Sequence, residues 1–148
     1  LPDAPLRAVR AALDMLRALD EFNRIRESQG QERIAIGIGI NTGPVIAGAI
    51  GSSRTLQYTV IGDAVNIAAR LCSTARASEI IISASTMRSC YGHVIAEQRT
   101  PVQVKGKSEP LQIWNVTGLT DISSTASGVP QVGQRHHTAP FRTTQEPT

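Results

Sequence analysis

The sequence predicts a mixed α/β domain, an α+β sandwich in which helices cover a sheet. Segments with strand and helix patterns alternate along most of the chain, and alternation of this kind is typical of helices packed on a sheet. The chain has 148 residues, of which 41% are hydrophobic. That length and composition support one packed domain of ordinary size and exclude wholesale disorder.

The first predicted element is an amphipathic helix over residues 5–28. Its apolar side chains recur at steps of three and four residues, which places them on one face of a helix. They are Leu6, Val9, Leu13 and Leu16. We expect this face to pack on the sheet.

The next predicted element is a buried strand over residues 33–40 in which bulky and small residues alternate. The bulky positions are Ile34, Ile36, Ile38 and Ile40, and the small ones are Ala35, Gly37 and Gly39. Alternate residues of a strand point to opposite faces. The face of small residues predicts that something approaches it closely: a helix, a partner chain or a ligand.

Several shorter elements follow this strand. A turn at 41–44 leads into an apolar segment at 45–50 and a strand at 56–61. A helix then runs from Asp63, a candidate N-cap, to about residue 75. The remaining candidates are strands at 80–82, 94–97, 102–104 and 111–116, with a short helix at 84–90.

The composition changes near residue 120. Residues 120–148 are rich in Ser, Thr, Pro, Gln and Gly, which predicts a disordered tail or linker. His136 and His137 lie in this tail and are not expected to bind metal. The two cysteines, Cys72 and Cys90, are too few for a disulfide framework and fit a reducing cytosol.

Charge and hydropathy argue against two classes of partner. The net charge is +3, but the arginines are scattered singly and aromatic residues make up only 3% of the chain. A nucleic-acid partner is therefore not expected, because such proteins usually cluster basic and stacking side chains. No apolar run approaches the ~20 residues of a membrane span.

Two groups of polar residues are candidates for chemistry. Asn66 and Arg70 stand four residues apart in the predicted helix and therefore share a face, where an amide and a guanidinium suit an oxygen-rich anion such as phosphate. Lys105 and Lys107, the only lysines, flank Gly106 in a loop and suit a polyphosphate. A solvent-facing strip and an ordinary basic turn are the alternatives.

Other chemistries lack support in the sequence. Gly37 and Gly39 lie inside a strand and Asp63 begins a helix, which is the wrong context for a dinucleotide-binding motif. No G-x-S-x-G nucleophile motif occurs, and His93 has no evident partner. The acidic residues between residues 33 and 118 are far apart in sequence, so no carboxylate pair for a metal ion is evident.

Three ordered segments together resemble the class III nucleotidyl cyclases, and most closely the bacterial adenylate cyclases. They are residues 36–48 (IGIGINTGPVIAG), 58–71 (YTVIGDAVNIAARL) and 104–110 (VKGKSEP). The match in order and spacing extends from about residue 5 to residue 118. The resemblance implies a ferredoxin-like fold and the conversion of ATP to 3′,5′-cyclic AMP and pyrophosphate for intracellular signalling.

The resemblance also implies roles for four residues of this chain. Asn66 would orient the ribose, and Arg70 would stabilise charge on the α-phosphate in the transition state. Lys105 would contact the terminal phosphates. Thr59 occupies a purine-reading position where adenylate cyclases commonly carry Asp or Thr and guanylate cyclases commonly carry Cys. Its hydroxyl can both donate and accept, so it favours ATP only weakly.

The chain departs from the family pattern at its beginning. Two aspartates that bind two Mg²⁺ or Mn²⁺ ions, and a purine-reading lysine, would precede Leu1, so we expect residues 1–119 to be a cyclase domain without its first third. The resemblance implies that two such domains pair head to tail as a homodimer. It also implies a cytoplasmic catalytic domain, whose parent protein could carry a membrane anchor upstream. We expect the isolated chain to be inactive and marginally stable, because the metal aspartates and part of the sheet are missing.

Three alternative functions remain open at this point. The first is a catalytically inactive, nucleotide-binding regulatory domain that keeps Asn66, Arg70 and Lys105. The second is a guanylate cyclase, against which Thr59 argues. The third is an interaction module, which would not require Arg70 or the lysines.

Overall fold

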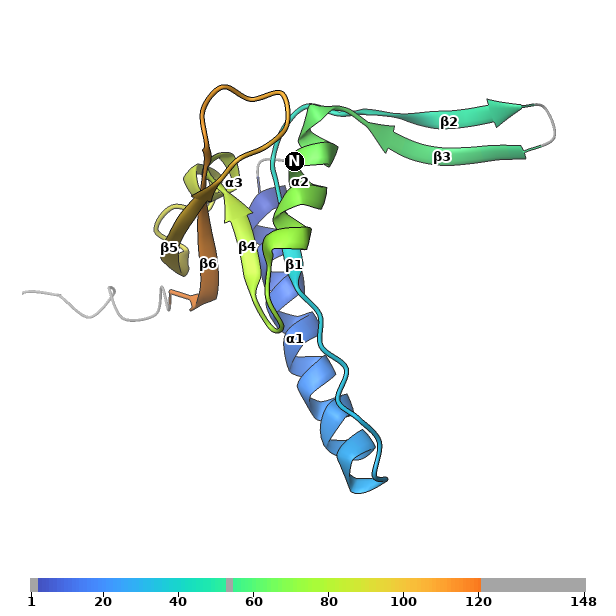
Figure 1. The fold of residues 1–148 in the computed structure, drawn as a ribbon, viewed down its shortest axis with the longest axis vertical. Coiled ribbons are helices and arrows are strands. Elements are labelled where there is room, and N and C mark those ends of the chain that lie inside the picture. Colours follow the sequence, from blue (N-terminus) through green and yellow to red (C-terminus); the bar gives the residue numbers. More distant parts are fainter. Residues whose placement is uncertain (1–2, 53–54, 121–148) are drawn as a thin grey trace, which may run out of the picture.

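A computed structural model describes residues 3–52 and 55–120 of the chain (Figure 1). The predicted tail beyond residue 120, with His136 and His137, lies outside the described residues. The elements in chain order are α1 (Ala4–Ser28), β1 (Ile38–Ile40), β2 (Ile46–Ser52), β3 (Thr55–Ile61), α2 (Asp63–Thr74), β4 (Ile80–Ser83), α3 (Ala84–Ser89), β5 (Val94–Val102) and β6 (Leu111–Leu119).

The described strands form a four-stranded sheet and a separate two-stranded ribbon. The sheet has the order β1-β4-β6-β5, with β1 parallel to β4 and the other pairs antiparallel. The ribbon joins β2 and β3, and Figure 1 shows it extending away from the rest of the molecule. The predicted mixture of helices and a sheet is confirmed. Within the described residues, no helix combines the length and apolarity needed to cross a bilayer.

One face of the sheet packs against α1 and α3. Val9 and Ala12 of α1 are buried with Ile80 and Ile82 of β4 and Cys90 after α3. The other predicted helix residues, Leu6, Leu13 and Leu16, pack against the same cluster. This confirms the amphipathic helix and identifies the face that it buries. Burial of Cys90 raises the pKa of its thiol, which therefore stays neutral at physiological pH.

The opposite face of the sheet packs against α2. Leu71 of α2 is fully buried against Ile81 of β4 and Ile113 of β6. Successive residues of β4 thus point to different helices, since Ile80 and Ile82 face α1 while Ile81 faces α2. All four residues of β4 are buried, so this central strand holds the two layers of helix together.

The close approach predicted for the small-residue face of β1 is made by α2. A Cβ added at Gly39 would collide with the backbone nitrogen of Cys72 and lie 2.7 Å from the carbonyl oxygen of Ala68. A Cβ at Gly37 would lie 2.8 Å from the carbonyl oxygen of Ala75. Of the three alternatives that the sequence left open, the structure selects a helix of the same chain.

The predicted strand at 33–40 is too long. Only Ile38–Ile40 form β1, because the ladder with β4 begins at Ile80. The Ser78 N–H still donates to the Ile36 carbonyl at 2.8 Å, but the φ of +63° at Ser78 interrupts the extended backbone that a longer ladder would need. The preceding residues run beside the distal half of α1 instead, and Ile34 is 42% exposed rather than buried. Likewise, the strand predicted at 94–97 continues to Val102 as β5, with irregularities in its register. Residues 103–104 of the strand predicted at 102–104 lie in the loop after β5.

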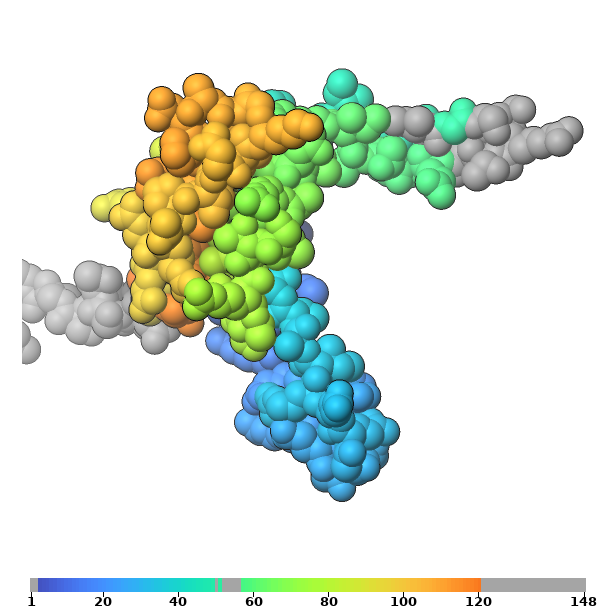
Figure 2. All heavy atoms as spheres, in the orientation of Figure 1, coloured from blue at the N-terminus to red at the C-terminus, as the bar shows by residue number. Residues whose placement is uncertain are grey.

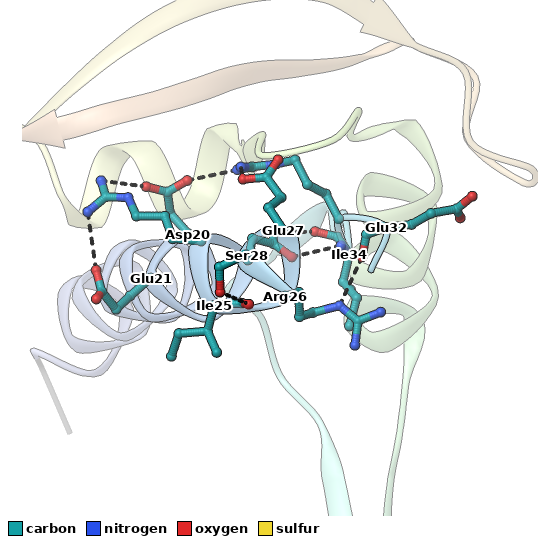
Figure 3. A network of polar contacts seen from close by, with 11 residues as sticks. Asp20, Glu21, Ile25, Arg26, Glu27, Ser28, Glu32 and Ile34 are labelled. Atoms are coloured by element: carbon teal, nitrogen blue, oxygen red, sulfur yellow. Dashed lines mark hydrogen bonds and ion pairs between the residues drawn. The ribbon is translucent and has the colours of Figure 1, made fainter. Parts of the chain in front are cut away.

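Polar contacts hold that extended segment to α1 (Figure 3). The side-chain amide of Asn23 is buried, donates to the Ile34 carbonyl at 2.8 Å and accepts from the Ile34 N–H at 2.8 Å. Arg33 pairs with Asp20 at 2.8 Å and Glu27 at 2.9 Å. The hydrogen bond from Arg33 lowers the pKa of the Asp20 carboxyl. The Asn23 side chain thus satisfies both the N–H and the carbonyl of Ile34, as the backbone of a neighbouring strand would.

A partly buried ion pair fixes the start of β4 against β5. The Glu79 carboxylate accepts a hydrogen bond from the Arg76 backbone N–H at 2.9 Å and another from the Arg99 guanidinium at 2.7 Å. The backbone hydrogen bond, and then Arg99, lower the pKa of Glu79 below its ordinary value of 4.5. Because the folded-state pKa is depressed, the ionised carboxylate stabilises the fold above that pH.

We expect Gly39→Ala to lower the free energy of unfolding by about 1–3 kcal/mol, because the added methyl group must push α2 away from β1. Gly48→Ala is the matched control, since Gly48 lies on the ribbon with nothing within 4 Å of an added Cβ. Urea denaturation of both variants measures the difference. Equal midpoints for the two variants would contradict the close packing of α2 on β1.

We expect Glu79→Gln to lower the free energy of unfolding by about 1 kcal/mol at neutral pH. The difference from the unmodified chain should shrink as the pH falls through 4.5 and below, because Glu79 then takes up a proton in both states. Glu97→Gln, an exposed change on β5, is the control. Denaturation curves across this pH range test the prediction, and a pH-independent difference would contradict it.

Candidate functional site

The packing of α2 determines where Asn66 and Arg70 point. Ala64 and Ala68 contact the glycines at β1 and in the loop after it. Each residue of an α-helix advances by about 100°, so side chains two positions further on lie on nearly the opposite side. Asn66 and Arg70 are both exposed, as this geometry requires. The structure thus brings the two predicted residues to one open face of α2.

Asp63 does not cap α2 as predicted. It is the first residue of the helix, Gly62 precedes it at the cap position, and no side-chain capping hydrogen bond forms. The Asp63 carboxylate pairs instead with the Lys107 ammonium at 2.6 Å. Gly62, with φ of 151°, allows the chain to turn sharply into the helix. The N-terminal end of the α2 helix dipole favours the negative charge of Asp63.

The second predicted group lies on the loop between β5 and β6, in a tight turn. The Lys107 N–H donates to the Val104 carbonyl at 3.1 Å, and Gly106 has φ of +84°. Lys105 does not have a positive φ, so the turn is of type II with Lys105 at its corner. Lys105 is exposed and pairs with no acidic side chain in the described part of the chain.

Thr59 lies near the base of the ribbon. It is exposed on β3, opposite Gly48 of β2, and β3 leads through Gly62 directly into α2. The structure therefore puts Thr59 and Asn66 on consecutive elements, while the loop that carries Lys105 comes from a distant part of the sequence. The ion pair between Asp63 and Lys107 joins these two regions.

The candidate residues lie on an open surface. In Figure 2, α2 is uncovered between the ribbon and the loop that connects β5 to β6. A shallow hollow of about 280 Å³ at the start of α2 is lined by Asn41, Thr42, Asp63 and Arg88, but by none of the four predicted residues. An exposed set of this kind cannot exclude water from a ligand by itself, so it resembles one wall of a site.

Sequence reasoning missed the roles of Asp63 and Lys107. The sequence predicts Asp63 as a helix cap and Lys107 as a second cation for a polyphosphate. Their opposite charges are the only sequence signal of a pair, and 43 residues separate them. That signal is too common to select one partner among the acidic residues of the chain.

The described residues do not fit a pair of divalent metal ions. Within residues 3–52 and 55–120, no three side chains of His, Cys, Asp or Glu gather closely enough to hold one ion. Asp63 is paired with Lys107 and Glu79 with Arg99. Hard cations such as Mg²⁺ need several carboxylate or carbonyl oxygens.

Comparison with known proteins now assigns the family. Residues 2–118 match the family described as the adenylate and guanylate cyclase catalytic domain. The chain belongs to this family. It is 38% identical to an adenylate cyclase of Anabaena cylindrica in an alignment of 118 residues that covers 74% of this chain. The predicted resemblance to nucleotidyl cyclases is confirmed.

Solved cyclase structures share the fold. The guanylyl cyclase Cya2 superposes with a TM-score of 0.76 at 36% identity, over 84% of this chain and 63% of that one. The adenylyl cyclase CyaB from P. aeruginosa superposes with a TM-score of 0.75 at 32% identity, over 78% of this chain and 60% of that one. The chain spans 24% of the length of the Anabaena enzyme. Cyclases named for either purine nucleotide are therefore among its relatives.

Proposed function

We propose that this cyclase domain supplies the ribose- and phosphate-contacting half of an adenylate cyclase site, which makes cyclic AMP for intracellular signalling in the cytoplasm. The observation that carries the proposal is the shared, exposed face of Asn66 and Arg70 on α2, beside the loop that bears Lys105. A guanidinium, an amide and an ammonium suit the oxygens of a nucleoside triphosphate.

In the proposed reaction, the ribose 3′-hydroxyl attacks the α-phosphate and pyrophosphate leaves. Asn66 orients the ribose, and Arg70 stabilises the charge that develops on the α-phosphate. Lys105 holds the terminal phosphates. Phosphoryl transfer depends mainly on positioning and charge stabilisation, which these side chains can supply. Mg²⁺ or Mn²⁺, when bound in the complete site, would contribute further charge stabilisation.

A second cyclase domain would complete the site. The candidate residues are open to solvent, and the described carboxylates form no metal cluster. The ribbon beside them exposes apolar side chains, including Ile46 at 75%, Tyr58 at 78% and Ile61 at 52%. Exposed apolar surface of this kind is typical of protein interfaces. These features support a head-to-tail arrangement in which the other domain brings the metal-binding carboxylates.

Two alternatives compete with this proposal. A guanylate cyclase would share the same fold and the same Asn66 and Arg70, and Thr59 is the residue that favours adenine over guanine. A catalytically inactive regulatory domain would bind nucleotide without turnover. The presence of both Asn66 and Arg70 on one exposed face favours an active site over a regulatory one.

We expect the chain to restore activity to an adenylyl cyclase domain that retains its metal-binding aspartates but carries Ala at the positions equivalent to Asn66 and Arg70. Arg70→Ala in this chain should lower the restored rate of cyclic AMP formation at least about 100-fold, because the developing phosphate charge loses its guanidinium. Arg10→Ala, an exposed change on α1, is the matched control and should leave the rate unchanged.

Association of the two domains is measured separately by size-exclusion chromatography. An assembly that forms but produces no cyclic nucleotide would support the regulatory alternative. Equal rates for Arg70→Ala and Arg10→Ala would contradict the role of Arg70.

We expect the restored enzyme to prefer ATP to GTP. Because one hydroxyl hydrogen bond contributes about 0.5–1.5 kcal/mol, Thr59→Ala should change the ratio of kcat/KM for the two nucleotides by no more than about tenfold. Thr117→Ala, an exposed change on β6, is the control. A preference for GTP in the unmodified chain would establish the guanylate cyclase alternative instead.

A further inference from the structure

We infer that Asp63 and Lys107 are a positioning pair that holds the Lys105 turn against α2. The inference rests on the proposed function, because it assigns Lys105 to the terminal phosphates. Neither Asp63 nor Lys107 needs to touch the nucleotide. They would act through the placement of Lys105 relative to Asn66 and Arg70.

The ion pair joins the two elements that carry the proposed contacts. Asp63 begins α2, three residues before Asn66 on the same rigid helix. Lys107 ends the turn whose corner is Lys105. The contact of 2.6 Å between carboxylate and ammonium is an exposed ion pair, so its effect on the position of the turn is modest. A movement of the turn away from α2 must break it.

The turn is internally fixed, so the position of Lys107 determines that of Lys105. The Lys107 N–H donates to Val104, and the Gln103 side-chain amide donates to the Lys107 carbonyl at 2.6 Å. Val104 is only 6% exposed and anchors one end of the turn in the body of the domain. With these restraints, the remaining freedom of the turn is a swing about its base, and the ion pair opposes that swing.

The charge arrangement also explains why the two lysines are not equivalent. Lys107 is neutralised by Asp63, whereas Lys105 pairs with no acidic side chain among the described residues. The turn therefore presents one uncompensated ammonium towards solvent at its corner. An acidic residue in the first turn of a helix is also favoured by the helix dipole, and Asp63 occupies that position in α2.

The first experiment measures backbone hydrogen exchange across residues 103–110 of the full chain without nucleotide. Asp63→Asn and Lys107→Met should speed exchange about two- to fivefold, the range expected for an exposed ion pair. Lys107→Arg should keep the protection of the unmodified chain. Glu109→Gln removes one negative charge from the same loop, where Glu109 forms no ion pair within the described residues, and is the matched control.

Salt provides a second readout of the same contact. In the unmodified chain, protection of residues 103–110 should fall in 1 M NaCl, where the Debye length is about 3 Å. In the Asp63→Asn variant, protection of residues 103–110 should be the same in 1 M NaCl as at low salt. Exchange in Asp63→Asn that is no faster than in Glu109→Gln would overturn the tether, as would equal exchange in Lys107→Arg and Lys107→Met.

The second experiment tests the link to Lys105 in the restored two-domain enzyme. Asp63→Asn should raise the KM for ATP about two- to fivefold with kcat little changed, and Lys107→Arg should retain the ordinary KM. In a Lys105→Ala background, Asp63→Asn should have no further effect on KM, because the group that it positions is gone. An undiminished effect in that background would overturn the inference.

Failure of the proposed function has a different signature. A two-domain assembly that forms but does not turn over ATP would contradict the role of Lys105 in catalysis. The proposed link between the ion pair and nucleotide binding would then fail as well. The exchange experiment would still report whether Asp63 and Lys107 hold the turn.

Discussion

The fold and the candidate site both depend on the packing of α2 against the glycine face of β1. A side chain larger than hydrogen at Gly39 would meet the backbone of Cys72 and Ala68, so the helix can approach only because this strand face is bare. That approach fixes the rotation of α2 about its own axis. It buries Leu71 on one side and directs Asn66 and Arg70 to the side that faces away from the sheet.

The same constraint explains why the site is open. One face of α2 packs on β1 and another packs on the core of β4 and β6. Only the outer surface of α2 is therefore available to a ligand. The described part of the chain offers no carboxylate cluster beside that surface. The described residues can therefore present cationic and amide groups accurately, but they do not enclose a nucleotide by themselves. The second domain proposed above would complete the enclosure.

Much of this could be predicted from the sequence, because periodicity and motif spacing are local signals. The helix containing Asn66 and Arg70 and the close approach to Gly37 and Gly39 follow from such patterns. The failures involve contacts between distant segments. A strand was predicted over residues 33–40, yet its length is limited by where β4 begins. Asp63 is a residue type that commonly caps helices, yet its carboxylate forms an ion pair with Lys107, which lies far away in the sequence.

Hydrogen exchange on the restored two-domain assembly, with and without a nonhydrolysable ATP analogue, would test the central claim most directly. The account predicts that the analogue slows exchange in α2 and in residues 103–110 of this chain. Exchange in α1, on the far side of the sheet, should not change. Protection confined to α1, or equal protection in a chain carrying both Asn66→Ala and Arg70→Ala, would contradict the assignment of this face to the nucleotide.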